Sequence, residues 1–240
     1  MPNTFLERLP FVFLFGVAFA VMLAGMGAGA WLLGKLVKAL RRLALSPEER
    51  QKQAAAARHP FAGVSLRGKE AWLVCCLEEA LVACGLDAEQ GEPGSWYPLL
   101  ALLWKFPELP EEFIEDWLDE TADILPSSVL SCDPGGPGEL SQGEKERSAA
   151  ACALYATARA RMALLGPLVE FPVRLVRENQ EDPAARPKLA LALLDEVGEL
   201  LESYGVPLPA PWVRDFLLAQ RSPGLGDRFV GRQCSGFVGW

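Results

Sequence analysis

The chain has 240 residues, a formal net charge of −8 and 50% hydrophobic residues. A mean hydropathy of +0.15 is high for so acidic a chain, and it indicates a very apolar segment joined to an acidic soluble part. The single histidine, His59, excludes most histidine-based catalysis and most histidine metal sites. Ordinary glycine and proline contents exclude a collagen-like or wholly disordered chain.

After a short N-terminal tail (1–10), residues 11–33 contain no charged side chain. As a helix, this stretch spans about 34 Å, which is enough for a hydrocarbon core of about 30 Å. We therefore expect a transmembrane helix over 11–34. No later stretch is comparably apolar, so the sequence predicts a single-pass protein.

A cleaved signal peptide is the main alternative, because Ala28-Gly29-Ala30 has the form of a cleavage site. Against it, the N-terminal residues are nearly neutral and the apolar run continues through Leu33. The basic residues that follow favour retention on the cytoplasmic side. We expect an uncleaved anchor in the inner (plasma) membrane, with the N-terminus outside and the C-terminal domain in the cytoplasm. An exported helical protein is the alternative.

Small residues recur along the predicted transmembrane helix. Such stripes let two helix backbones approach closely in lipid, so we expect a packing face for self-association or for another membrane protein. The spacing Gly25-x-Gly27-x-x-Ala30 loosely resembles a dinucleotide-binding fingerprint, but no strand pattern precedes it. The predicted helix-packing residues are Gly16, Ala20, Ala24, Gly25, Ala28 and Gly29.

Charge is divided sharply along the chain. Residues 1–58 carry 8 basic and 3 acidic residues (net +5), whereas 59–240 carry 15 basic and 28 acidic residues (net −13). The sequence predicts a basic juxtamembrane helix over 35–58, ended by His59-Pro60. Its cations also set the orientation of the protein and lie beside anionic lipid headgroups. They are Lys35, Lys38, Arg41 and Arg42.

The remainder is predicted to be all-α, with a helical cytoplasmic domain over 59–221, a possible loop division at 132–143 and a Gly-rich C-terminal tail over 222–240. Strand patterns are absent. The predicted helices cover about 67–84, with one broad apolar face, then 96–105, 110–124, 144–165, 184–204 and 211–220. Residues 96–105 are too apolar for a surface helix. The sequence allows two interpretations of residues 167–178: they continue the fourth helix, or the helix breaks at Pro167 and Pro172.

No motif identifies a reaction. The six cysteines form no C-x-x-C pair, and Gly63–Gly68 misses the spacing of a nucleophile elbow. P-loop, EF-hand and HExxH patterns are absent. We therefore assign no catalytic, cofactor-binding or metal-binding residue.

The most distinctive feature outside the predicted membrane helix is a run of acidic residues with no basic residue among them. Such a run is typical of a solvated surface, and it also suits docking of a basic protein partner. Nucleic acid is disfavoured, because a net charge of −13 repels phosphate. The predicted acidic docking face comprises Glu108, Glu111, Glu112, Glu115, Asp116, Asp119, Glu120 and Asp123.

These features favour a membrane-anchored, non-enzymatic accessory or adaptor subunit of a multi-protein membrane complex, such as a secretion or conjugation apparatus. The alternative from another class is a bitopic enzyme or regulator that uses carboxylates.

Overall fold

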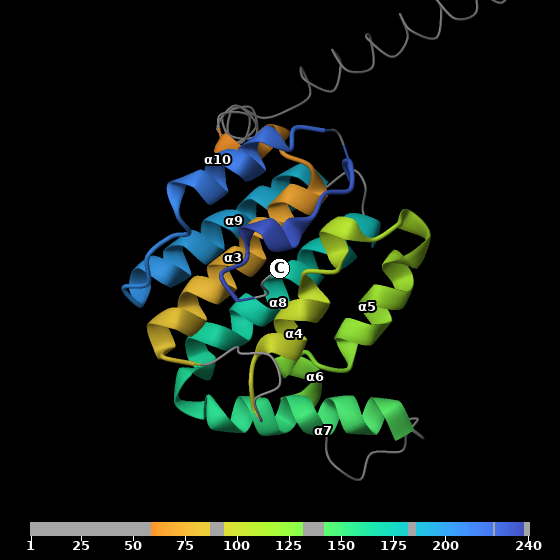
Figure 1. The fold of residues 1–240 in the computed structure, drawn as a ribbon, viewed down its shortest axis with the longest axis vertical. Helices are drawn as coiled ribbons and strands as arrows, with labels where there is room; N and C mark the ends of the chain where they lie inside the picture. Colours follow the sequence, from red (N-terminus) through yellow and green to blue (C-terminus); the bar gives the residue numbers. More distant parts are fainter. Residues whose placement is uncertain (1–58, 87–93, 132–141, 182–185, 223, 238–240) are drawn as a thin grey trace, which may run out of the picture. The chain divides into compact units, whose positions relative to one another are not determined.

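The computed structural model describes residues 59–86, 94–131, 142–181, 186–222 and 224–237, all within one compact unit. All regular secondary structure in these ranges is helical (Figure 1), which confirms the all-α prediction for this part of the chain. No helix here is long and apolar enough to cross a membrane. The predicted transmembrane and juxtamembrane helices lie outside the described residues.

The central helix is α3 (Leu66–Cys84). Ser65 caps its N-terminus, since its side chain accepts a hydrogen bond from the Gly68 N–H, and Gly85 ends it in the left-handed conformation with φ of 67°. The helix packs against α8, α9, α10 and the short helix η2 (Figure 1). The prediction of one apolar face was therefore too narrow, because most of α3 is buried on every side.

A group of short helices follows α3: α4 (Tyr97–Leu103), η2 (Phe106–Glu108), η3 (Glu111–Phe113), α5 (Ile114–Ala122) and α6 (Pro126–Ser131). Four leucines of α4 are buried, which confirms that 96–105 is not a surface helix. The predicted helix over 110–124 begins as the 3-10 turn η3 and continues as α5.

The predicted helix over 144–165 is two helices. α7 (Gln142–Thr157) is separated by η4 (Arg159–Arg161) from α8 (Met162–Glu181). The Thr157 hydroxyl donates to the Leu154 carbonyl at 2.6 Å, a local bond that competes with helix propagation. α8 then continues through Pro167 and Pro172, which lack the N–H donors of two helix hydrogen bonds, and burial of the neighbouring side chains stabilises the helix through packing.

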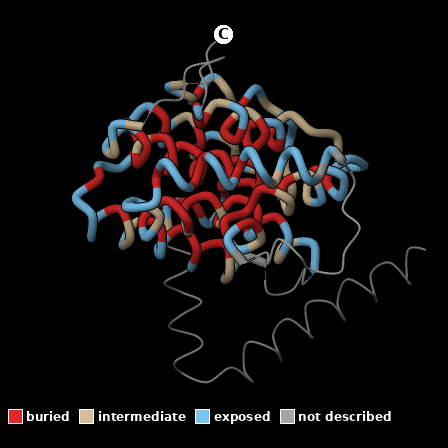
Figure 2. Tube along the Cα trace, turned by 90° about the horizontal axis from the view of Figure 1, so that it is seen from below, coloured by how far each residue is buried: buried red, intermediate tan, exposed pale blue. Residues whose placement is uncertain are grey.

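The last helices, α9 (Arg186–Ser203) and α10 (Pro211–Ala219), agree with the predictions over 184–204 and 211–220. After α10 the chain returns across α3 (Figure 1) and forms a short helix, η5 (Gly231–Cys234). The carbonyls of Gly224 and Leu225 accept hydrogen bonds from the first two N–H groups of α3. Buried residues gather in the interior along α3 and α8, and exposed residues cover the outside (Figure 2). One short helix, η1 (Pro60–Gly63), precedes α3.

Candidate functional site

Four charged residues of α3 are buried: Arg67, Lys69, Glu70 and Glu78. Burying a charge is costly in free energy unless the group is paired or hydrogen-bonded. The hydrogen-bond partners of these four side chains therefore decide how costly each burial is. Lys69 is the simplest case. Its ammonium donates to the Val64 carbonyl at 2.5 Å, and burial lowers the pKa of Lys69.

Glu78 holds the C-terminal segment on α3. Its carboxylate accepts hydrogen bonds from the Trp104 indole N–H at 2.8 Å, from the Gly236 N–H at 2.8 Å and from the Ser235 hydroxyl. Burial raises the pKa of Glu78, although these three hydrogen bonds act in the opposite direction. One buried carboxyl thus joins α3, the residue after α4 and the C-terminal segment.

Arg67 and Glu70 lie nearer the start of α3 and are less well satisfied. Arg67 Nη1 donates to the Pro107 carbonyl at 3.0 Å, and the guanidinium carbon lies 5.9 Å from the Phe106 ring centroid. Arg67 Nε and both carboxyl oxygens of Glu70 are buried without a hydrogen-bond partner among the described residues. Burial raises the pKa of Glu70 well above its ordinary value, with Arg67 partly opposing the rise.

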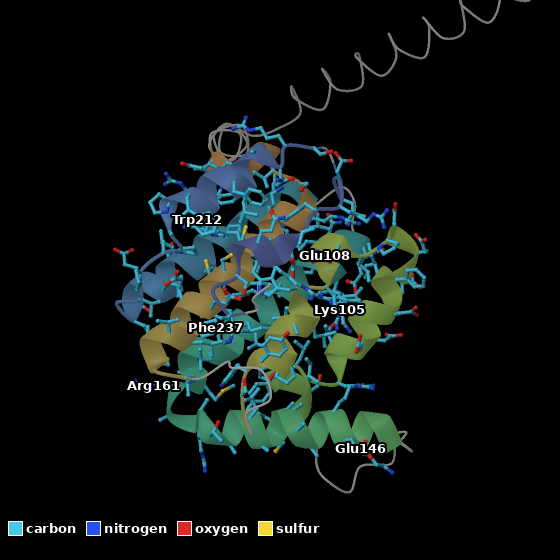
Figure 3. The ribbon with its side chains drawn as sticks, in the orientation of Figure 1. Lys105, Glu108, Glu146, Arg161, Trp212 and Phe237 are labelled. Carbon is cyan, nitrogen blue, oxygen red and sulfur yellow. The ribbon has the colours of Figure 1, made fainter. Side chains whose placement is uncertain are left out.

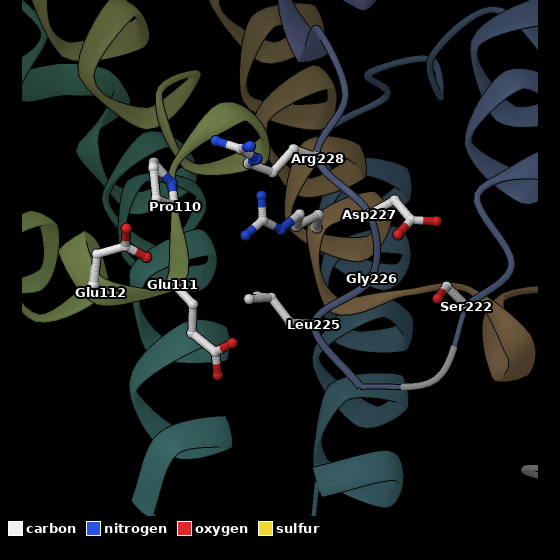
Figure 4. A pocket seen from close by; sticks show the side chains of 9 residues that line it. Pro110, Glu111, Glu112, Ser222, Leu225, Gly226, Asp227 and Arg228 are labelled. Atoms are coloured by element: carbon white, nitrogen blue, oxygen red, sulfur yellow. The ribbon is translucent and has the colours of Figure 1, made fainter.

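A hollow of about 620 Å³ lies between the start of α3, η3 and the loop after α10 (Figure 4). Burial and then the charge of Arg228 lower the pKa of Arg67, whereas the charges of Glu111, Asp227 and Glu70 act in the opposite direction. Neither Arg67 nor Arg228 forms an ion pair with a carboxylate of the described residues. The lining residues are Arg67, Pro110, Glu111, Glu112, Ser222, Leu225, Gly226, Asp227 and Arg228.

Two glycines allow the C-terminal segment to approach this site. Gly226 has φ of 82°, and a Cβ atom there would lie 2.2 Å from the Ser65 Cβ. A Cβ atom at Gly231 would lie 2.8 Å from the Pro107 ring and 2.9 Å from the Trp104 ring. Glycine is therefore required at both positions for the close contact.

The predicted acidic docking face is partly neutralised by basic residues from outside the run. Glu108 lies 3.5 Å from Arg232 Nε, Glu120 lies 3.2 Å from Lys105 Nζ and Asp123 lies 2.5 Å from Arg147 Nη2. Lys105 and Glu108 are labelled in Figure 3. The exposed acids without such a partner in the described residues are Glu111, Glu112, Glu115, Asp116 and Asp119, which we call the acidic surface.

The other predicted site residues cannot be placed. The helix-packing positions from Gly16 to Gly29 and the predicted headgroup residues from Lys35 to Arg42 lie outside the described residues.

The three buried cysteines are not activated. Cys75 and Cys76 are buried in α3, and burial raises the pKa of both thiols. Burial also raises the pKa of Cys234 to about 12. These thiols are therefore held in the protonated, poorly nucleophilic form. Within the described ranges no group of three or more His, Cys, Asp or Glu side chains could hold a metal ion.

The sequence analysis did not identify Arg67, Glu70, Glu78 and Arg228 as site residues. The first three could have been recognised, because they are charged residues in a predicted helix whose other residues are mostly apolar. Arg228 could not have been recognised in this way, since it lies in a Gly-rich segment whose apolar residues show no helical periodicity.

Comparison with known proteins adds no relative: no family model matches the chain, and no curated protein or solved structure matches it.

Proposed function

We propose that this protein is a membrane-anchored, non-enzymatic accessory or adaptor subunit of a multi-protein membrane complex. One observation carries the proposal: an uncharged stretch of 23 residues (11–33) is followed directly by basic residues and then by an acidic, compact helical unit. This order is typical of a single-pass anchor with its N-terminus outside and a cytoplasmic C-terminal domain in the inner membrane.

The described surface supports an interaction role. Trp212 in α10 is 59% exposed and lines a second hollow, of about 240 Å³, together with exposed Val82 and with Phe237. Trp212 and Phe237 are labelled in Figure 3. Exposed large apolar side chains gathered at one place are typical of protein–protein interfaces. The acidic surface adds an electrostatic feature that favours a basic protein partner.

The proposed membrane contacts come from the sequence. The small-residue stripe between Gly16 and Gly29 suits association with another transmembrane helix or a second copy of the chain. The cations from Lys35 to Arg42 suit anionic lipid headgroups. A secretion or conjugation apparatus is the kind of assembly that such an architecture fits.

Topology is the first test. The full chain with a C-terminal epitope would be expressed in a bacterial host, fractionated and treated with protease as intact cells, spheroplasts and lysed spheroplasts. We expect the protein in the membrane fraction and the epitope digested only after lysis. A matched chain lacking residues 1–34 should leave the membrane fraction. Digestion of the epitope in spheroplasts, or a mature N-terminus near Trp31, would overturn the proposed topology.

The subunit role is tested separately by purification in mild detergent with mass spectrometry of co-eluting proteins. We expect stable partners that are lost when Trp212 and Val82 are both replaced by Ser. Elution of the wild-type chain alone as a monomer would contradict the subunit role while leaving the topology result standing.

A further inference from the structure

We propose that the hollow between α3, η3 and the loop after α10 binds a carboxylate group carried by a basic peptide segment, and that Arg67 and Arg228 hold this carboxylate. The inference deepens the adaptor function and rests on it for the source of the peptide. The binding chemistry itself follows from the residues that line the hollow.

The first observation concerns Arg67. The side chain is only 2% exposed, and its place is fixed by the bond from Nη1 to the Pro107 carbonyl. Nε nevertheless has no acceptor among the described residues. A buried guanidinium with an unused donor is unfavourable by itself, and an anion placed beside the guanidinium in the hollow would offset part of this cost through its charge.

The second observation is that Arg228 lines the hollow together with Arg67. The Pro107 carbonyl accepts from both Arg67 Nη1 at 3.0 Å and the Phe229 N–H at 3.1 Å, so one backbone oxygen fixes the Arg67 side chain and the backbone next to Arg228. Figure 4 shows Arg228 at the edge of the hollow, across from Glu111 and Glu112. The two guanidinium groups repel one another, although the charges of Glu111, Asp227 and Glu70 act in the opposite direction on Arg67. An anion between the two groups would reduce this repulsion.

The backbone does not compete for the ligand. The first N–H groups of α3, at Leu66 and Arg67, already donate to the carbonyls of Gly224 and Leu225. The Gly68 N–H donates to the Ser65 hydroxyl. The two guanidinium groups are therefore the cationic donors that line the hollow, and a planar carboxylate matches their geometry.

The acidic lining selects the chemical class. Glu111, Glu112 and Asp227 also line the hollow, and they would repel a doubly charged phosphate more strongly than a singly charged carboxylate. The same three side chains attract cations close to that carboxylate. The acidic surface continues from η3 along α5 through Glu115, Asp116 and Asp119, so a basic chain leading away from the hollow would meet favourable charge. An anionic membrane surface or a free phosphate fits this lining less well.

The test uses the full chain in detergent and a fluorescein-labelled tetrapeptide of three lysines and a C-terminal leucine. It would be compared with its C-terminal amide by fluorescence anisotropy. We expect the free acid to bind at least about tenfold more tightly than the amide, since the amide lacks the charge-assisted contacts to both arginines. An amidated peptide with one internal glutamate separates a side-chain carboxylate from a chain end as the source.

Variants locate the binding. Arg228→Gln should weaken the free acid to the level of the amide, whereas Arg214→Gln, the same charge change on exposed α10, should leave both peptides unaffected. Glu112→Gln should weaken both peptides. Equal binding of acid and amide, or unchanged binding by Arg228→Gln, would overturn the proposal. Competition by inorganic phosphate at lower concentration than by acetate would overturn the carboxylate class. Failure of peptide binding would leave the topology and co-purification results untouched, so the two proposals fail separately.

Discussion

Helices α3 and α5 both carry several charged side chains, but they use them in opposite ways. On α3 four of the charged residues are buried, and two of them, Lys69 and Glu78, have specific hydrogen-bond partners. On α5, Glu115, Asp116 and Asp119 point outward without a partner in the described part of the chain, while Trp117 and Ile114 supply the buried side.

The contrast between α3 and α5 shows that the effect of a charged side chain depends on its burial. A buried charge interacts strongly with its neighbours and is expensive to leave unsatisfied, so a single substitution on α3 should change stability. Exposed charges are screened by water and salt, so those on α5 should affect association with other molecules rather than folding. Four predictions test this contrast.

The largest effect is expected for Glu78→Ala. The change leaves the Trp104 indole N–H and the Gly236 N–H without their acceptor and should lower the free energy of unfolding by about 2–4 kcal/mol. Urea unfolding measures this change, and limited proteolysis should show earlier cleavage within 224–237. Glu79→Ala on the neighbouring, partly exposed position is the control. Equal stability of the two variants would contradict the role of Glu78 in holding the C-terminal segment.

A second substitution tests another contact between the C-terminal segment and the start of α3, the close approach of Gly226 to Ser65. Gly226→Ala places a methyl group against Ser65 and forces a non-glycine residue to φ of 82°, which should cost about 1–3 kcal/mol. Gly236→Ala is the matched control, because nothing lies within 4 Å of its built Cβ position. Thermal unfolding of both variants measures the difference. A loss of the same size at Gly236 would show that the segment is sensitive to any side chain rather than to this close approach.

Glu70 gives a smaller effect with a defined pH dependence. Its folded-state pKa is raised by burial, so the native state binds the proton more tightly than the unfolded chain does. The contribution of Glu70 to stability is therefore fully present below about pH 4.5 and is lost as the pH rises through the folded-state pKa.

As the pH rises from 5 to 8, we expect the free energy of unfolding of Glu70→Gln to increase by about 1 kcal/mol or more relative to that of wild type. The reason is that the Gln side chain does not ionise, whereas the Glu70 carboxyl does. Urea unfolding at several pH values measures this difference. Glu115→Gln, the same substitution at an exposed position of α5, is the matched control. A constant difference between Glu70→Gln and wild type at all pH values would show that Glu70 does not titrate with folding.

The smallest stability effect is expected when the acidic surface is neutralised on α5 by Glu115→Gln, Asp116→Asn and Asp119→Asn together. The free energy of unfolding should change by less than about 0.5 kcal/mol per site, because these side chains are exposed. Binding of the lysine peptide should weaken and become less dependent on salt. A large loss of stability with unchanged peptide binding would reverse the contrast between the two helices.

Local sequence patterns predicted much of the fold. Gly85 ends α3 through the left-handed conformation, which depends on neighbouring residues only, as the predicted helix over about 67–84 required. The N-cap at Ser65 was not predicted. The division between α7 and α8 was missed because neither glycine nor proline stands between Thr157 and Met162. Pro167 and Pro172 could not be interpreted from sequence alone, because packing around α8 overrides their local preference.

The candidate site also combines features that the sequence predicted with features that depend on packing. The acidic run was visible in the sequence, but its neutralisation by Arg147 and Arg232 was not, because these residues arrive from distant segments. The amino-acid sequence alone predicts the all-α class of the described unit, the ends of its most regular helices and the acidic character of its surface. These properties follow from composition, periodicity and local capping.

Only the tertiary structure decided that Arg67, Glu70 and Glu78 are buried, and that the Gly-rich C-terminal segment lies across α3 and brings Arg228 to Arg67. Burial and long-range contact depend on how every helix packs around α3, and no local pattern carries that information.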